Sequence, residues 1–167
     1  MKKISFLCAL ALLLALALSS CGQTELHAVL LNDNAKTVDG EAFAARYTPL
    51  TFTYPAFSGS IEDKDNAFGY LVLNTKEDYD AVFPAGAGFE ADLTRETVVI
   101  YAFTAIYIRP MTLEKLTIKD GKLEVALKMQ KNSGGAEPIA DATAPFQRYV
   151  VFKLDKAEFT GVSITIE

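Results

Sequence analysis

Apolar residues are unevenly distributed along the chain, and the first run of them differs from all later ones. Ile4 to Leu18 is apolar at every position except Ser5, and it follows Lys2 and Lys3. The run is shorter than the roughly 20 residues that a membrane-spanning helix needs. A basic start before an apolar run of this length is typical of a secretory signal. We therefore expect residues 1–20 to be a signal peptide.

Beyond the signal, apolar and polar residues mostly alternate, as they do in strands with one buried face. Asp120-Gly121 lies between two such runs and suits a type I′ turn, which predicts a hairpin. Thr97 to Phe103 is instead continuously apolar, which predicts a central strand buried on both faces. Further strands are expected within 47–54, 57–61, 68–73, 149–154 and 162–166.

One segment has the spacing of a short helix. Thr75 is followed three residues later by Asp78, as in a capping box. Tyr79, Val82 and Phe83 then share one helical face, and Pro84 ends the pattern. A helical turn or two is also compatible with Glu41 to Arg46.

These elements predict the fold class and the domain organisation. Strands outnumber helices, and the short connections favour antiparallel neighbours. We expect a mainly β (α+β) domain, an antiparallel β-sandwich or half-barrel of about seven strands with one short helix packed on it. Residues 21–45 are weakly periodic and are interpreted as a lipidated tether, and residues 46–167 as a single β-rich domain.

The signal ends in Leu18-Ser19-Ser20-Cys21, which resembles the bacterial lipobox. In that motif an aliphatic residue and two small ones precede a cysteine whose thiol takes a diacylglycerol. We expect Cys21 to carry the lipid and to hold the chain on the cell membrane or the outer membrane, facing the periplasm or the exterior. Gln23 stands where an aspartate would resemble an inner-membrane retention signal, which favours the outer membrane in a host that has one.

Composition excludes several function classes. The chain has 16 Lys and Arg against 21 Asp and Glu, and this acidic balance without a basic cluster argues against nucleic-acid binding. Cys8 leaves with the signal, and the one histidine, His27, falls in the expected tether. A His/Cys metal site or a Ser-His-Asp triad therefore lacks its residues. We expect no cofactor, no metal site and no catalytic residue.

The order and spacing of six stretches match the pattern of a known family; these are 57–61, 74–79, 82–83, 91–99, 120–123 and 144–151. In these stretches the chain resembles the PrcB-type family, named for a lipoprotein subunit of a bacterial surface protease complex. The resemblance implies a non-catalytic accessory role beside a protease. The chain departs from the family after the central strand, where Phe103 to Ile108 replaces a Gly-rich turn and keeps only Tyr107.

Two places are candidate interaction sites. Tyr107 and Arg109 belong to the residue types enriched in interface hot spots, although strand-end packing with a solvated arginine is the simpler interpretation. Gly134 and Gly135 lie in the connection 131–145, which is longer than most. Its small residues favour disorder over a binding loop.

Two clusters of acidic residues are weaker candidates for a functional site. Asp63 and Asp65, with Glu62 and Asn66, offer oxygens for calcium but lack the EF-hand pattern, so a solvated turn is the simpler interpretation. Glu90, Asp92 and Glu96 would need a cleft to act on a glycosidic bond.

The leading functional hypothesis is a membrane-anchored, non-enzymatic accessory module that presents loops or a sheet edge to a protein partner, such as a surface protease. An enzyme acting on envelope polymers through acidic residues and a small-molecule-binding lipoprotein are the alternatives.

Overall fold

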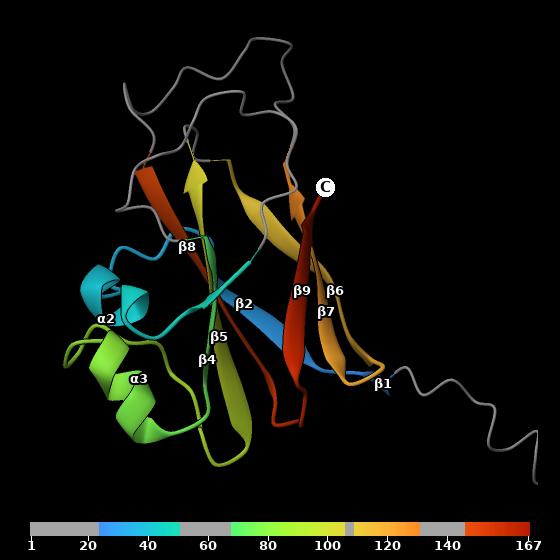
Figure 1. The fold of residues 1–167 in the computed structure, drawn as a ribbon, viewed down its shortest axis with the longest axis horizontal. Coiled ribbons are helices and arrows are strands. Elements are labelled where there is room, and N and C mark those ends of the chain that lie inside the picture. Colours follow the sequence, from blue (N-terminus) through green and yellow to red (C-terminus); the bar gives the residue numbers. More distant parts are fainter. Residues whose placement is uncertain (1–23, 51–67, 106–108, 131–145) are drawn as a thin grey trace, which may run out of the picture.

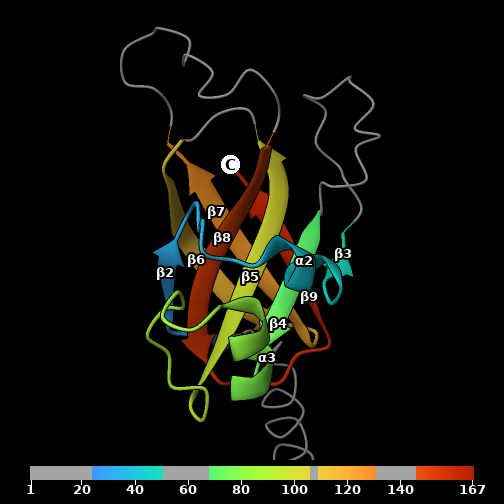
Figure 2. The same ribbon diagram turned by 90° about the vertical axis from the view of Figure 1, so that its left-hand side faces the viewer.

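The computed structural model describes residues 24–50, 68–105, 109–130 and 146–167. Two β-sheets pack face to face, with two short helices on the outside of one of them (Figures 1 and 2). The predicted mainly-β sandwich is therefore confirmed. The expected strand 57–61 and the rest of the segment 51–67 lie outside the described residues.

Each sheet has a simple strand order. The four-stranded sheet has the order β1-β6-β7-β9, and the five-stranded sheet has the order β2-β8-β5-β4-β3. The first sheet consists of β1 (Thr24–Glu25), β6 (Met111–Lys119), β7 (Lys122–Met129) and β9 (Gly161–Ile166). The second consists of β2 (Ala28–Asn32), β8 (Phe146–Asp155), β5 (Glu96–Ala105), β4 (Gly69–Leu73) and β3 (Thr48–Pro49).

Strand β5 is the centre of the five-stranded sheet, as its continuous apolar sequence predicts. Val99, Tyr101 and Phe103 point into the core between the two sheets. Val98 and Ile100 belong to a second core under the helices. Because both faces of β5 are covered, neither set of alternate positions needs to be polar.

The helices α2 (Gly40–Ala44) and α3 (Lys76–Val82) cover the outer face of the five-stranded sheet (Figure 2). The hydroxyl of Thr75 accepts a hydrogen bond from the backbone of Asp78 at 3.2 Å, which confirms the predicted cap. Asp39 caps α2, and Phe43 on that helix is fully buried. The helical turn expected within Glu41–Arg46 is therefore present as a second packed helix.

The predicted hairpin at Asp120-Gly121 is also confirmed. Both residues have positive φ, 50° and 75°, as a type I′ turn requires. Lys119 and Lys122 face each other directly before and after the turn.

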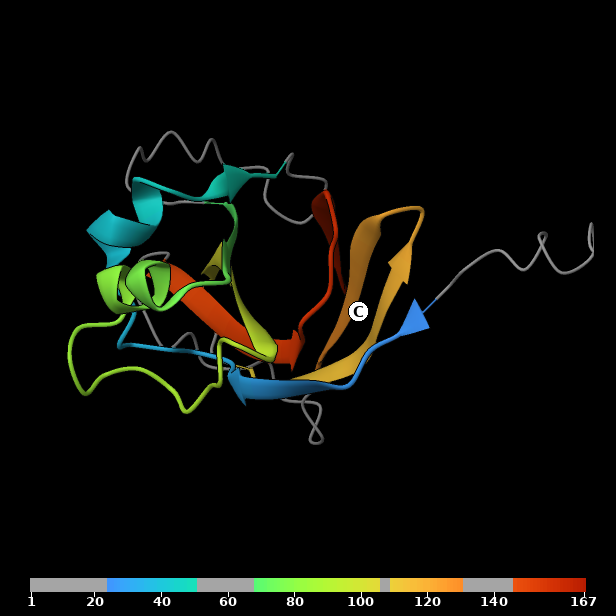
Figure 3. The same cartoon turned by 90° about the horizontal axis from the view of Figure 1, so that it is seen from below.

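The tether predicted for residues 21–45 is wrong from Thr24 onward. Strand β1 pairs with β6, strand β2 pairs with β8, and the backbone of Asp155 donates to the carbonyl of His27 at 3.0 Å. The segment has a weak period because both faces of β2 carry apolar residues: Leu30 packs into the core between the sheets and Leu31 into the core under the helices. Figure 3 shows the chain passing from β1 to β2 along one side of the sandwich.

The antiparallel expectation fails for one pair, since β9 lies parallel to β7. Strand β8, which separates them in sequence, belongs to the other sheet. The chain thus leaves the four-stranded sheet after β7, returns through β8, and enters the first sheet again in the original direction.

Candidate functional site

The described strands end in two groups at opposite ends of the sandwich (Figure 1). We call the first group the hairpin end; it comprises the turn Lys119–Lys122 and the loop Lys156–Thr160, whose Thr160 backbone donates to the Gly121 carbonyl at 2.8 Å. We call the second group the distal end. Its pairings are Ala105 with Phe146 and Met111 with Met129.

Most sequence-predicted site residues cannot be placed. Cys21, Tyr107, Gly134 and Gly135 lie outside the described residues, as do Glu62, Asp63, Asp65 and Asn66 of the acidic turn. The described residues that flank Tyr107 and the Gly134-Gly135 pair all belong to the distal end.

Arg109 is described, and it lies half-buried at the distal end. Its carbonyl accepts a hydrogen bond of 2.7 Å from Nη2 of Arg148. The fully solvated arginine of the strand-end interpretation is therefore not observed. The segment around Arg109 is held against the start of β8 through its main chain.

Arg148 is the unusual residue of this end, because its side chain is fully buried. Its Nε donates to the Asp33 carbonyl at 2.6 Å, and Nη2 lies 3.2 Å from the Asp33 carboxylate. That carboxylate also accepts from the backbone of Met111 at 2.8 Å. One guanidinium thus ties together the end of β2, the start of β6 and the start of β8.

Burial lowers the pKa of Arg148, and the nearby Asp33 carboxylate opposes this shift. An arginine pKa starts so high that the group stays charged at neutral pH. Sequence reasoning missed this residue. Its signal is a charge at an inward position of β8, on the same face as Val150, Phe152 and Leu154.

The acidic group Glu90, Asp92 and Glu96 has the geometry of a structural turn. Asp92 accepts from the backbone and hydroxyl of Thr94, at 3.0 and 2.6 Å. Glu96 accepts from the Asp92 backbone at 2.7 Å and lies 2.9 Å from Lys153.

Hydrogen bonds from Thr94 hold the pKa of Asp92 below its usual range, and the Lys153 ammonium does the same for Glu96. A general acid for glycoside hydrolysis needs the opposite, a raised pKa. The arrangement therefore favours two ionised carboxylates whose hydrogen bonds stabilise the turn in which they lie.

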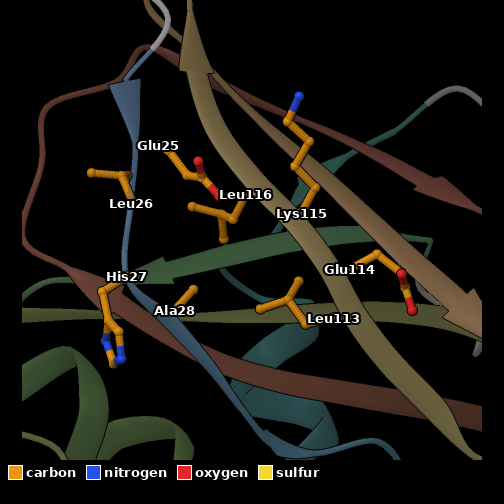
Figure 4. A pocket seen from close by; sticks show the side chains of 8 residues that line it. All are labelled: Glu25, Leu26, His27, Ala28, Leu113, Glu114, Lys115 and Leu116. Carbon is orange, nitrogen blue, oxygen red and sulfur yellow. The ribbon is translucent and has the colours of Figure 1, made fainter.

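A shallow groove runs between the chain at Glu25–Ala28 and β6 at Leu113–Leu116, with a volume of about 520 Å³. Figure 4 shows Ala28, Leu113 and Leu116 between the two strands and the Lys115 ammonium pointing away from them. A site for a small molecule normally encloses most of its ligand. This groove is open along its length, so it matches poorly the enclosed cavity expected of a small-molecule carrier.

The strand edges differ in how they are protected. An unprotected edge offers backbone donors and acceptors to any extended chain, so proteins keep edge strands short, bulged, charged or covered. Strands β1 and β3 have two residues each, and β2 is bulged and followed by the Asp33 contacts. Strand β9 has six residues without charge, proline or register shift, and within the described part of the chain it pairs only with β7.

The outward-facing backbone groups of β9 can be identified from its hydrogen bonds. The backbone N–H and carbonyl of Glu167 both bond to the β7 side, with Leu127 and Met129 at 2.9 and 2.8 Å. Successive residues of a strand direct these groups to opposite sides. The N–H and carbonyl groups of Val162, Ile164 and Ile166 therefore point to the free edge.

Among the described residues, no group of His, Cys, Asp and Glu side chains is arranged to hold a metal ion. No helix in this part of the chain has the length and hydropathy needed to cross a membrane. Comparison of the chain with models of known families, with curated proteins and with solved structures finds no match.

Proposed function

We propose that this protein is a lipid-anchored, extracytoplasmic binding module that pairs an extended segment of a partner protein with the edge of β9. The anchor is the diacylglycerol on Cys21, and it follows from the Leu18-Ser19-Ser20-Cys21 motif after a signal-like run. The module acts as an accessory to its partner and is not itself an enzyme.

The proposed binding of a partner rests on the contrast between β9 and the other edge strands. The described edge strands other than β9 are short or bulged, whereas β9 is a regular, uncharged run of Gly-Val-Ser-Ile-Thr-Ile. Main-chain hydrogen bonds from such an edge supply affinity when an extended peptide adds to the sheet. The half-buried Ile164 and Ile166 give the incoming segment apolar neighbours.

A protein is the partner class that fits this edge. The outward N–H and carbonyl groups of Ile164 and its neighbours match an extended polypeptide, and the acidic chain repels nucleic acid. Given the order of stretches that resembles PrcB-type lipoproteins, a surface protease is the first partner to test.

Site-specific photo-crosslinking tests this proposal. A photoreactive residue replaces Thr165, which is exposed on β9, in the full-length lipidated protein at native expression. We expect a crosslink to a different polypeptide. The matched position is Thr112, which is exposed on β6 and should give no such product.

A pair of variants separates main-chain pairing from side-chain contact. Ile164→Pro removes an outward N–H, whereas Ile164→Ala removes the same side chain and keeps that donor. We expect the Thr165 crosslink to be lost with proline and retained with alanine. Equal crosslinking in both variants, or a product containing only a second copy of this chain, would contradict the proposal.

A further inference from the structure

The chain enters the sandwich beside the β6–β7 turn. Thr24 pairs with Ile118 and Glu25 with Thr117, in antiparallel register. Ile118 is two residues before the turn residue Asp120, so Thr24, the first described residue, lies at the hairpin end beside β6 (Figure 1).

The covalent chain limits how far the anchor can lie from this end. Cys21 precedes Thr24 by three residues, and three extended residues span at most about 11 Å. Strand β7 alone, from Lys122 to Lys128, extends about 20 Å at the usual rise of a strand. An anchor on Cys21 therefore keeps the hairpin end close to the bilayer and leaves the distal end farther away.

The charges of the hairpin turn are a second, independent observation. Lys119 and Lys122 are exposed and directly opposite each other, and neither lies within 4.0 Å of a carboxylate in the described part of the chain. Lysines next to a membrane are attracted by anionic headgroups. Over the whole hairpin end, the two acids Asp120 and Glu158 offset part of the charge of Lys119, Lys122 and Lys156.

We propose that the hairpin end, formed by Lys119–Lys122 and Lys156–Thr160, lies against the lipid headgroups, with Lys119 and Lys122 facing anionic lipid. This inference rests on the lipid anchor of the proposed function. Beyond that function, it specifies which surface of the sandwich faces the membrane and how the sandwich is oriented. Strand β9 begins at this end and runs away from the membrane, so its edge stays accessible to a partner.

Headgroup quenching measures this orientation. The lipidated full-length protein is reconstituted into vesicles that contain zwitterionic and anionic phospholipid and a lipid with a quencher on its headgroup. A fluorophore is attached to a cysteine introduced by Lys122→Cys or by Lys128→Cys. Both positions are exposed on the same face of β7, and the thiol of Cys21 is blocked by its lipid.

We expect the label at position 122 to lose most of its fluorescence and the label at position 128 to keep it. Equal quenching at both positions, or stronger quenching at 128, would overturn the orientation while leaving the anchor intact. Failure of the protein to stay with the vesicles would instead overturn the anchor and the orientation together.

A second measurement tests whether Lys119 and Lys122 face anionic lipid. With the fluorophore moved to Asp120→Cys, quenching should increase as anionic lipid is added. Replacing Lys119 and Lys122 by Gln should abolish that increase, whereas Lys128→Gln should not. An increase that survives the double replacement would show that these lysines do not face anionic lipid.

Discussion

At the distal end, the buried guanidinium of Arg148 holds three chain segments together. It donates to the main chain of Asp33 and Arg109 and pairs with the Asp33 carboxylate. Removing one partner of a buried ion pair leaves the other groups without compensation, which typically costs 3–5 kcal/mol. We predict that Arg148→Met lowers the free energy of unfolding by about 3 kcal/mol, as measured by urea denaturation.

The exposed pair of Lys76 and Asp80 provides the control. The two groups lie 2.7 Å apart, but both side chains are more than half exposed. Lys76→Met should therefore change stability by less than about 0.5 kcal/mol. Losses of similar size in the two variants would mean that Arg148 does not organise the distal end.

The β6–β7 hairpin depends on the backbone conformation of one glycine. Gly121 has a φ of 75°, and a Cβ there would meet nothing closer than the Thr160 hydroxyl at 3.8 Å. The cost of Gly121→Ala is therefore conformational, and we predict a loss of about 1 kcal/mol in thermal or urea unfolding.

Gly161 at the start of β9 is the matched position. It does not have positive φ, and a Cβ there would lie 4.0 Å from the Tyr70 hydroxyl. Gly161→Ala should be neutral or slightly stabilising. If both alanine variants are equally unstable, the turn conformation is not the cause.

Among the helices and strands, those with a clear local sequence pattern were predicted correctly. The hairpin, the doubly buried β5 and the Thr75 cap all follow from nearby residues. Strand β2 was assigned to a tether because its short run Ala-Val-Leu-Leu is apolar on both faces and so shows no alternation of apolar and polar residues. The parallel pairing of β7 with β9 depends on β8 crossing to the other sheet, which no local pattern records.

The sequence predicted the candidate site less well than it predicted the fold. The edge of β9 has no strand beside it in the described part of the chain because of the strand order, since the same sequence in an inner position would be covered. The Arg148 cluster joins residues that are 115 positions apart in the chain. Its one local signal is a charge at an inward position of a strand.

The proposed lipid anchor determines how the molecule as a whole is oriented. An anchor on Cys21 places the hairpin end at the membrane, turns the distal end outward and leaves β9 running between the two. In the proposed orientation the edge of β9 faces the extracytoplasmic side, where its proposed partner lies. The proposed orientation and the proposed partner both depend on lipidation of Cys21.

Metabolic labelling with radioactive palmitate in a bacterial host tests whether Cys21 is lipidated. Three forms of the full chain are compared: the unaltered protein, Cys21→Ala and Cys8→Ala, which removes the other cysteine. We predict label in the unaltered protein and in Cys8→Ala, and none in Cys21→Ala. Label that persists in Cys21→Ala, or is absent from the unaltered protein, would contradict a lipid anchor on Cys21.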